Sequence, residues 1–152
     1  MTSDALATLV VTHRYAISAE RVFDAFLDVA VARRFLFATA DGEMIEASLD
    51  PRVGGRFVFV DRRSGMGDVR HVGEVLQIDR PRRLVLSFGV PQFDPRMTTV
   101  TLDLRPDGDG CELTLTHEGV APEWADGSRD GWRRILAGLE PALAGVHAAG
   151  WR

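Results

Sequence analysis

Three histidines, His13, His71 and His117, lie in segments whose alternating pattern is typical of strands, and they are the natural candidates for acid–base chemistry. His117 continues the apolar face of the strand that starts at Cys111, so we expect it to point inward. His13 shares a face with Tyr15, and neighbouring first and last strands would bring it near His117. We therefore name His117 and His13 as candidate catalytic residues. Two ordinary histidines without a catalytic role are the simpler interpretation.

Other kinds of reactive site are poorly supported. No serine lies in a nucleophile elbow, and no glycine-rich stretch has the phosphate-loop pattern. His13, His117 and Cys111 lack the close spacing of metal ligands, so we expect neither a metal nor a cofactor. A charged residue that points inward from a strand would need a partner, and an Arg–carboxylate pair could then orient a polar ligand group. The charged strand residues are Glu46, Arg56, Asp61, Arg70 and Glu74, most of which should face water.

Apolar residues on the predicted elements carry a second kind of signal. Each one alone is most simply explained by core packing, but together they would line a cavity suited to a hydrophobic ring or chain. The predicted ligand-pocket residues are Phe23, Phe35, Phe57, Phe59, Phe88, Leu102, Leu115, His117, Trp132, Leu136 and Leu139.

A long C-terminal helix over 126–147 should position these residues. Its apolar side chains recur with helical spacing and form one stripe: Trp132, Ile135, Leu136, Leu139, Leu143 and Val146. At 1.5 Å per residue this helix would be roughly 30 Å long, enough to cross a small domain. Pro141 cannot donate a hydrogen bond to the carbonyl of Ala137, so we predict a bend there.

The upstream pattern predicts a strand over 9–17, a helix that begins after Ser18, a second short helix over 29–37, and then strands only as far as residue 118. Short turns, most clearly Pro106–Gly110, favour an antiparallel meander. The fold class is therefore α+β, with a curved antiparallel sheet of about seven strands wrapped around the long helix. A cavity is expected between sheet and helix.

Composition sets the outer limits. The chain has 152 residues, a length that suits a single domain over residues 1–152. Its residues are 45% apolar, and its net charge is −4. No apolar run approaches the ~18 residues that span a bilayer, and Met1–Ala7 lacks the basic residues of a secretory signal. The single cysteine fits a reducing cytoplasm.

The acidic balance argues against a nucleic-acid partner. All 18 basic residues are arginine, which we attribute to codon bias. The arginines near two turns are most simply a solvated surface: Arg62, Arg63, Arg80, Arg82 and Arg83.

Several motifs in a fixed order resemble one known family. These are Ile17–Phe26, Asp50–Phe57, Gly73–Leu84, Leu113–Gly119, and Gly131-Trp132 followed by Ile135, Leu136 and Leu139. They are similar to a strand-to-helix junction, a double-glycine turn, a long strand with a proline turn, a last strand and a closing helix. In this order they resemble the activator-of-heat-shock-chaperone-ATPase-like group of the START and polyketide-cyclase (SRPBCC) superfamily. The resemblance implies the helix-grip fold.

The resemblance and the apolar lining together favour a cytoplasmic protein that binds a hydrophobic, lipid- or polyketide-like small molecule without catalysis. One alternative is an enzyme like polyketide cyclases or dehydratases, in which His117 or His13 is the general base and Arg14, Arg56 or Tyr15 steadies an enolate. Another is a chaperone co-regulator, with the stress-response role that the family name implies. A strand at the sheet edge over 44–49 could support a homodimer.

Overall fold

The computed structural model describes the backbone of residues 5–148 and the side chains of residues 5–145. The elements follow in the order β1 (Ala7–Tyr15), α1 (Ala19–Leu27), α2 (Val29–Phe35), β2 (Glu43–Leu49), β3 (Arg56–Arg63), β4 (Gly67–Asp79), β5 (Arg83–Phe88), β6 (Thr98–Asp107), β7 (Gly110–Val120), the 3-10 turn η1 (Pro122–Trp124), α3 (Ala125–Ala137) and α4 (Leu139–Ala148). Most of Met1–Ala7, the segment that is not expected to be a secretory signal, lies outside the described residues. The side chain of Val146 also lies outside them.

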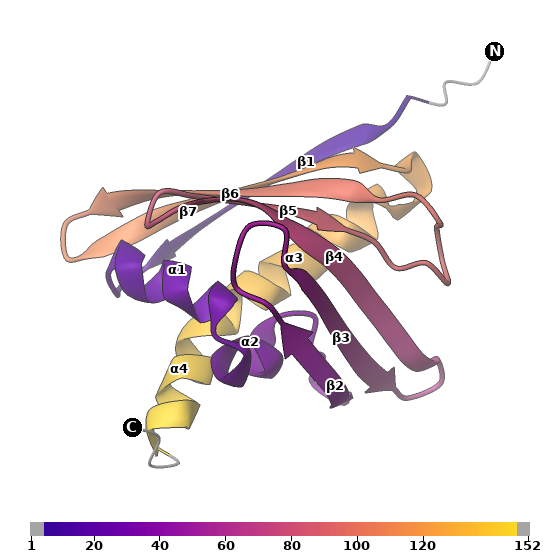
Figure 1. Cartoon of the computed structure of the whole chain (residues 1–152), viewed down its shortest axis with the longest axis horizontal. Helices are drawn as coiled ribbons and strands as arrows, with labels where there is room; N and C mark the ends of the chain where they lie inside the picture. The colour runs from indigo at the N-terminus through magenta and orange to yellow at the C-terminus, as the bar shows by residue number, and fades with distance from the viewer. Residues whose placement is uncertain (1–4, 149–152) are drawn as a thin grey trace.

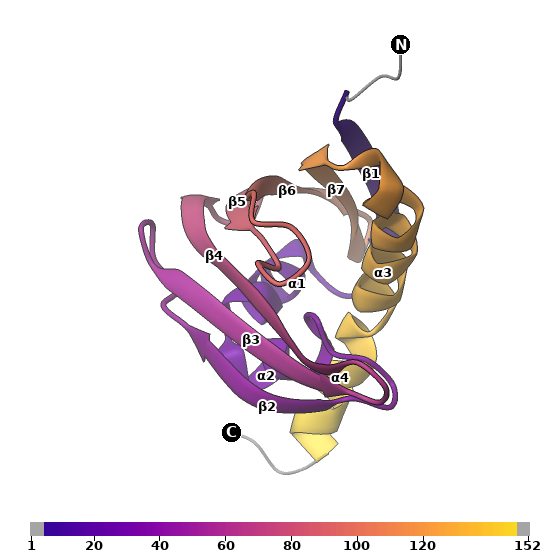
Figure 2. The ribbon, with the colours of Figure 1, turned by 90° about the vertical axis from the view of Figure 1, so that its right-hand side faces the viewer.

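The seven strands form one antiparallel sheet in the order β1-β7-β6-β5-β4-β3-β2. The sheet is strongly curved, and α3 and α4 run along its concave side together with α1 and α2 (Figures 1 and 2). This is the helix-grip fold that the sequence predicts. The predicted hairpin at Pro106–Gly110 joins β6 to β7, and β2 is an edge strand as expected. Homodimer formation through this edge stays a prediction.

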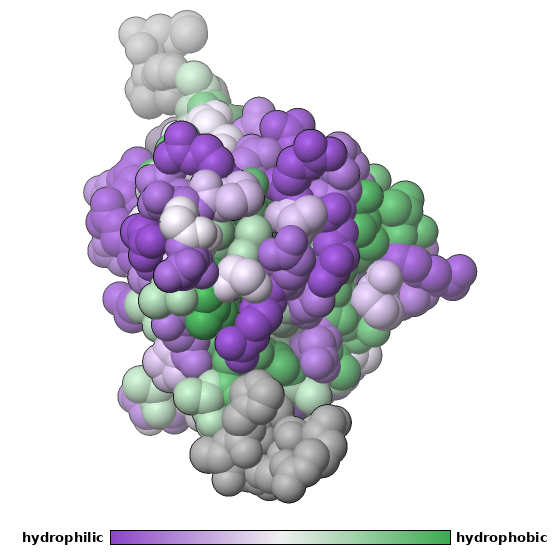
Figure 3. Space-filling model, turned by 90° about the vertical axis from the view of Figure 1, so that its left-hand side faces the viewer, coloured by the Kyte–Doolittle hydropathy of each residue, from purple (hydrophilic) through white to green (hydrophobic). Residues whose placement is uncertain are grey.

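The core lies between the concave face of the sheet and the helices. Alternation along the strands places Leu102 and Leu115 inside, where they meet Trp132, Leu136 and Leu139 from the helices. Seen from the side on which the β6–β7 hairpin and α1 lie in Figure 1, the surface is mostly hydrophilic with small hydrophobic areas (Figure 3). No helix among the described residues is long and apolar enough to cross a membrane.

The C-terminal helix bends, but upstream of the expected position. The helical run divides at Gly138, whose N–H contacts the carbonyls of Arg134, Ile135 and Leu136. The proline ring at 141 disturbs the carbonyl four residues earlier, that of Ala137, so the distortion appears at the preceding turn. The hydroxyl of Tyr15 donates to the Leu136 carbonyl at 2.7 Å and satisfies an acceptor beside the break.

The second short helix ends at Phe35, two residues before the expected end. Leu36 is extended, and Phe37 adopts a left-handed backbone conformation with φ of 63°. A helix cannot continue through such a residue. Phe37 is nevertheless buried, so this turn directs a large aromatic ring into the interior.

Candidate functional site

Aromatic side chains fill much of the space between the sheet and α3. The ring of Phe37 stacks on His71, with centroids 4.6 Å apart and planes 9° apart, and on Phe88, at 4.9 Å and 4°. Trp132 from α3 meets both phenylalanines edge-on, each at 5.8 Å. The cavity expected between sheet and helix is therefore occupied by the protein's own rings at this point.

An apolar pocket of about 130 Å³ opens at one end of this aromatic cluster. Its residues come from the end of β5, the β5–β6 loop over residues 89–97, β6, β7, η1 and α3. Figure 2 shows this loop in front of the space between the sheet and α3. The pocket residues are Phe88, Gly89, Val90, Phe93, Asp94, Arg96, Thr98, His117, Val120, Ala121, Trp124 and Ser128.

Two exposed aromatic residues form part of the pocket rim. Phe93 from the β5–β6 loop and Trp124 from η1 stack with centroids 5.9 Å apart and planes 24° apart. They are 42% and 45% exposed, which is unusual for rings of this size. The charges of Asp94 and Arg96, beside them, are paired with each other at 2.9 Å.

His117 forms part of the pocket wall, and both of its ring nitrogens have partners. The indole N–H of Trp132 lies 3.0 Å from Nδ1, which must accept. Nε2 lies 2.7 Å from Thr98 Oγ1, and that hydroxyl lies 2.7 Å from the Phe88 carbonyl, to which it donates. His117 is thus a neutral Nε2–H imidazole that donates to Thr98. Burial lowers its pKa to about 4, which agrees with this assignment.

This network decides what His117 can do chemically. A general base needs a free lone pair aimed at the substrate, and the lone pair on Nδ1 is already used by Trp132. The proposed partner, His13, is not close: β1 pairs Leu9 with His117, and His13 pairs with Leu113. The two histidines lie four strand residues apart, about 13 Å. The strands are neighbours as predicted, but the expectation that the two histidines lie close together is wrong.

A second group of polar side chains, on β3 and β4, includes buried residues. Asp61 is fully buried, and its Oδ2 accepts from Arg63 Nε at 3.0 Å and from Thr39 Oγ1 at 2.7 Å. Arg63 also donates to the carbonyl of Phe37 at 3.3 Å. The inward Arg–carboxylate pair that the sequence analysis considered is present here.

His71 completes this second cluster. Its Nδ1 lies 3.1 Å from the Phe59 carbonyl and must donate to it, which leaves Nε2 to accept from Arg63 at 3.4 Å. Burial, the largest cause, lowers the pKa of His71 to about 4, and the nearby Arg63 adds to the effect. The cluster thus contains a neutral imidazole, a guanidinium and a carboxylate in contact with the ring and carbonyl of Phe37.

The predicted pocket residues divide into two sets. Phe88 and His117 line the apolar pocket. The others pack in the hydrophobic core: Phe23, Phe35, Phe57, Phe59, Leu102, Leu115, Trp132, Leu136 and Leu139. Sequence reasoning missed Phe93, Trp124 and Phe37, which lie in loops or turns where no periodicity marks the direction of a side chain. Exposed aromatic residues in predicted loops are the signal that would have identified the first two.

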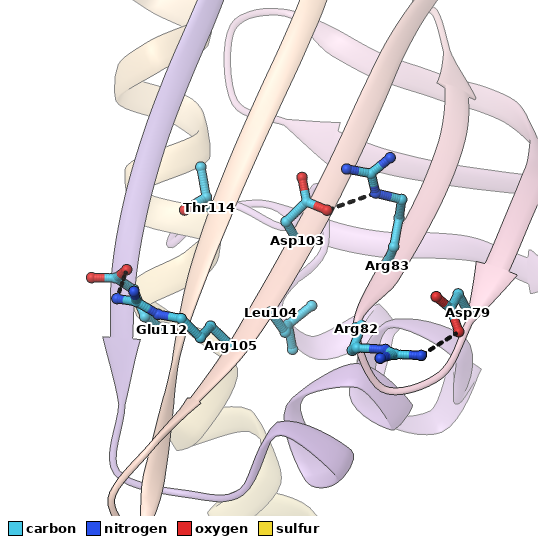
Figure 4. Close-up of a pocket in the computed structure, with 8 residues that line it drawn as sticks. All are labelled: Asp79, Arg82, Arg83, Asp103, Leu104, Arg105, Glu112 and Thr114. Atoms are coloured by element: carbon cyan, nitrogen blue, oxygen red, sulfur yellow. Dashed lines mark hydrogen bonds and ion pairs between the residues drawn. The ribbon is translucent and has the colours of Figure 1, made fainter.

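A larger, polar hollow of about 390 Å³ lies on the outer face of the sheet. Its charged side chains are already paired, Arg83 with Asp103 at 2.7 Å and Arg105 with Glu112 at 2.8 Å (Figure 4). Arg62, Arg63, Arg80 and Arg82 also each contact a carboxylate. The arginine-rich turns are thus largely neutralised, as a solvated surface would be, but the expectation is wrong for Arg63, which turns inward to the buried Asp61. Among the described residues no group of three or more acidic, histidine or cysteine side chains could hold a metal ion.

Comparison with known structures finds proteins that share this fold. Mll3558 from Rhizobium loti is 32% identical, with a TM-score of 0.75 over 93% of this chain and 99% of that protein. CalU16 from Micromonospora echinospora is 24% identical, with a TM-score of 0.69 over 91% of this chain and 76% of that one. SA2116 from Staphylococcus aureus, a protein of unknown function, is only 12% identical but has a TM-score of 0.82 over 95% and 97% of the two chains.

No curated protein is significantly similar to the chain. The family model described as "Activator of Hsp90 ATPase homolog 1-like protein" matches residues 16–144, which include every element from α1 to α3 and most of α4. The match covers the strands and helices that build the apolar pocket, the hydrogen-bond network of His117, and the polar cluster on β3 and β4. The chain therefore belongs to the Activator of Hsp90 ATPase homolog 1-like family, within the helix-grip proteins of the SRPBCC superfamily.

Proposed function

We propose that this protein binds a compact hydrophobic molecule in the apolar pocket between the β5–β6 loop and the start of α3. The observation that carries the proposal is the pocket itself, with the exposed Phe93–Trp124 pair at its rim. A volume of about 130 Å³ is close to that of an engineered apolar cavity that binds benzene. The pocket would take a single ring or the end of a chain.

The polar groups of the pocket favour a neutral ligand. Nε2 of His117 donates to the Thr98 hydroxyl, which donates to the Phe88 carbonyl. Asp94 and Arg96 form an ion pair at the rim. An ionised ligand would lose its hydration without gaining a free partner of opposite charge, which is unfavourable. Apart from Ser128, the other side chains of the wall are apolar, so burial of the ligand's own apolar surface supplies the affinity.

The same network makes binding a better proposal than catalysis. A cyclase-like reaction with His117 as base would first have to break the hydrogen bond from Trp132, leaving a buried indole N–H without an acceptor. His13 lies too far along β1 to assist. We therefore propose that Phe88 and His117 contact the ligand and that neither reacts with it.

A blocking variant tests the pocket. Ser128, half-buried in the pocket wall on α3, can be changed to Phe so that the new ring fills the space. Ser64→Phe, on the exposed β3–β4 turn, is the matched control. Toluene should raise the thermal unfolding temperature of the parent and of Ser64→Phe, because a ligand that binds only the native state stabilises it. It should not raise that of Ser128→Phe. An equal rise in all three proteins would refute the assignment.

Native mass spectrometry of the freshly purified protein, set against the denatured mass, then addresses the natural ligand. A reproducible extra mass that is retained by Ser64→Phe and lost by Ser128→Phe would give the size of a molecule bound in this pocket.

A further inference from the structure

The polar cluster on β3 and β4 is built at a cost that packing alone does not explain. Asp61 and His71 are buried, and an ion pair in the core gains little over apolar residues of similar volume. In addition, Oδ1 of Asp61 is buried and has no hydrogen-bond partner among the described residues. A buried carboxylate oxygen without a donor is uncommon and calls for an explanation.

The loop over residues 36–42 covers this cluster. Phe37 places its ring on His71 and its carbonyl on Arg63. At the other end of the loop, Gly42 lies directly on the carboxylate, since a Cβ atom there would be 2.7 Å from Asp61 Oδ1. Thr39 joins the loop to the same carboxylate. The covering loop therefore accepts a hydrogen bond from the Arg63 guanidinium and stacks on the His71 ring, but it gives Asp61 Oδ1 no hydrogen-bond donor.

Phe37 holds its position in a conformation that phenylalanine rarely adopts. Its φ of 63° lies in the left-handed region, which is usually occupied by glycine or asparagine. Such outliers persist only where surrounding contacts hold them, and they concentrate at ligand sites and switches. Here the contacts are five aromatic neighbours and one hydrogen bond from Arg63.

We propose that Asp61, Arg63 and His71 form a second binding subsite, which the ring and carbonyl of Phe37 occupy in the structure as an internal stand-in for a ligand. The ligand is an aromatic molecule that carries a hydrogen-bond acceptor beside a donor, as a carboxamide does. Its ring replaces the Phe37 ring on His71 and Phe88, its acceptor replaces the Phe37 carbonyl on Arg63, and its donor satisfies Asp61 Oδ1. The loop over residues 36–42 must lift for it to bind.

This subsite is separate from the apolar pocket. None of Phe37, Asp61, Arg63 and His71 lines that pocket, and only Phe88 belongs to both. Toluene binding at the pocket and ligand binding under the loop can therefore succeed or fail independently.

Benzamide is the test ligand because it has the ring, the acceptor and the donor. Acetophenone has the same shape without the donor, and cyclohexanecarboxamide has the amide without the aromatic ring. Phe37→Gly removes the ring of the stand-in, keeps its backbone carbonyl, and suits the left-handed backbone. Phe57→Ala is the matched control, because it opens a hole beside Phe37 but leaves the cluster covered.

Benzamide should bind Phe37→Gly on the order of 10- to 1,000-fold more tightly than the parent, because the competent state of the parent is a minor population. In Phe37→Gly it should bind on the order of tenfold more tightly than acetophenone, which leaves Oδ1 unpaired. Phe57→Ala should not distinguish benzamide from acetophenone. Equal affinities of Phe37→Gly for benzamide and acetophenone would overturn the proposal, because they would show a plain apolar hole.

The parent protein supplies a second test that does not depend on a variant folding. In an NMR titration up to the solubility limit, benzamide should shift the amide signals of residues 36–42 and the ring signals of His71, and cyclohexanecarboxamide should not. Absence of benzamide shifts there, or shifts only at Phe93 and Ser128 around the apolar pocket, would overturn the proposal.

Discussion

At the scale of single residues, the interior is organised by hydrogen bonds that fix histidine tautomers. Trp132 donates to Nδ1 of His117, and the Phe59 carbonyl accepts from Nδ1 of His71, so the two neutral rings have opposite tautomers. Each ring is held by its fixed partners in one orientation. His117 is therefore better suited to shaping a pocket wall than to transferring protons.

Removal of the indole donor should destabilise the protein measurably. Trp132→Phe keeps an aromatic ring but leaves Nδ1 of His117 buried without a donor. We expect the free energy of unfolding in urea to fall by about 1–3 kcal/mol. Trp124→Phe removes the same N–H from a side chain that is 45% exposed and should change it by less than about 0.5 kcal/mol. Equal effects of the two changes would contradict the hydrogen-bond assignment.

Phe37 should reverse the usual order of glycine and alanine. Loss of this buried ring costs about 3–5 kcal/mol, but a left-handed backbone costs about 1–2 kcal/mol in any residue that has a Cβ atom. Phe37→Gly should therefore be more stable than Phe37→Ala by about 1 kcal/mol in urea unfolding. A more stable alanine variant would show that residue 37 is not held at positive φ.

At the scale of elements, the regular spacing of apolar residues along the chain predicted the strands and helices, because that spacing decides which face of an element is buried. The strand alternation, the Pro106–Gly110 hairpin and a helix that begins after Ser18, whose side chain accepts from the Arg21 N–H, are confirmed. The missed feature is non-periodic: the left-handed turn at Phe37. The bend that Pro141 predicts is present, with the break at Gly138, three residues upstream. The turn at Phe37 depends on contacts between distant segments, and a local pattern does not encode these contacts.

Tyr15 connects the first strand to the helix break, and this connection can be tested. Tyr15→Phe removes the hydroxyl that donates to the Leu136 carbonyl and leaves that buried acceptor with less support. The free energy of unfolding should fall by about 1–3 kcal/mol, measured by urea denaturation. If the variant is as stable as the parent, the hydroxyl does not support the break between α3 and α4.

At the scale of the whole molecule, the fold was more predictable than the site. The sheet, its strand order and the covering helix follow from patterns spread over the chain. The pocket depends on how a few rings fill the interior: Phe37 occupies the space expected to be open, and only Phe88 and His117 of the predicted lining reach the pocket. Volumes and packing of this kind cannot be read from residue types alone.

The two buried histidines should make the whole protein sensitive to acid. Burial lowers the pKa of each from 6.5 to about 4, so between these values the unfolded chain binds more protons than the native state. Their stabilising contribution is complete above pH 6.5 and is lost as the pH falls to about 4. The expected loss is about 3 kcal/mol for each histidine.

Urea unfolding at a series of pH values measures this dependence, with His117→Gln for comparison. The variant should lose stability less steeply than the parent between pH 6.5 and 4, because one of the two histidines has been removed. Parallel curves for the two proteins would show that His117 is not buried in the neutral form.

The most direct test of ligand binding is an NMR titration of the isotope-labelled protein with toluene. We predict saturable shifts confined to amides around the apolar pocket, such as those of Gly89, Phe93 and Ser128, and their loss in Ser128→Phe but not in Ser64→Phe. No saturable shift, or shifts elsewhere that survive in Ser128→Phe, would contradict the proposal that this pocket binds a hydrophobic molecule.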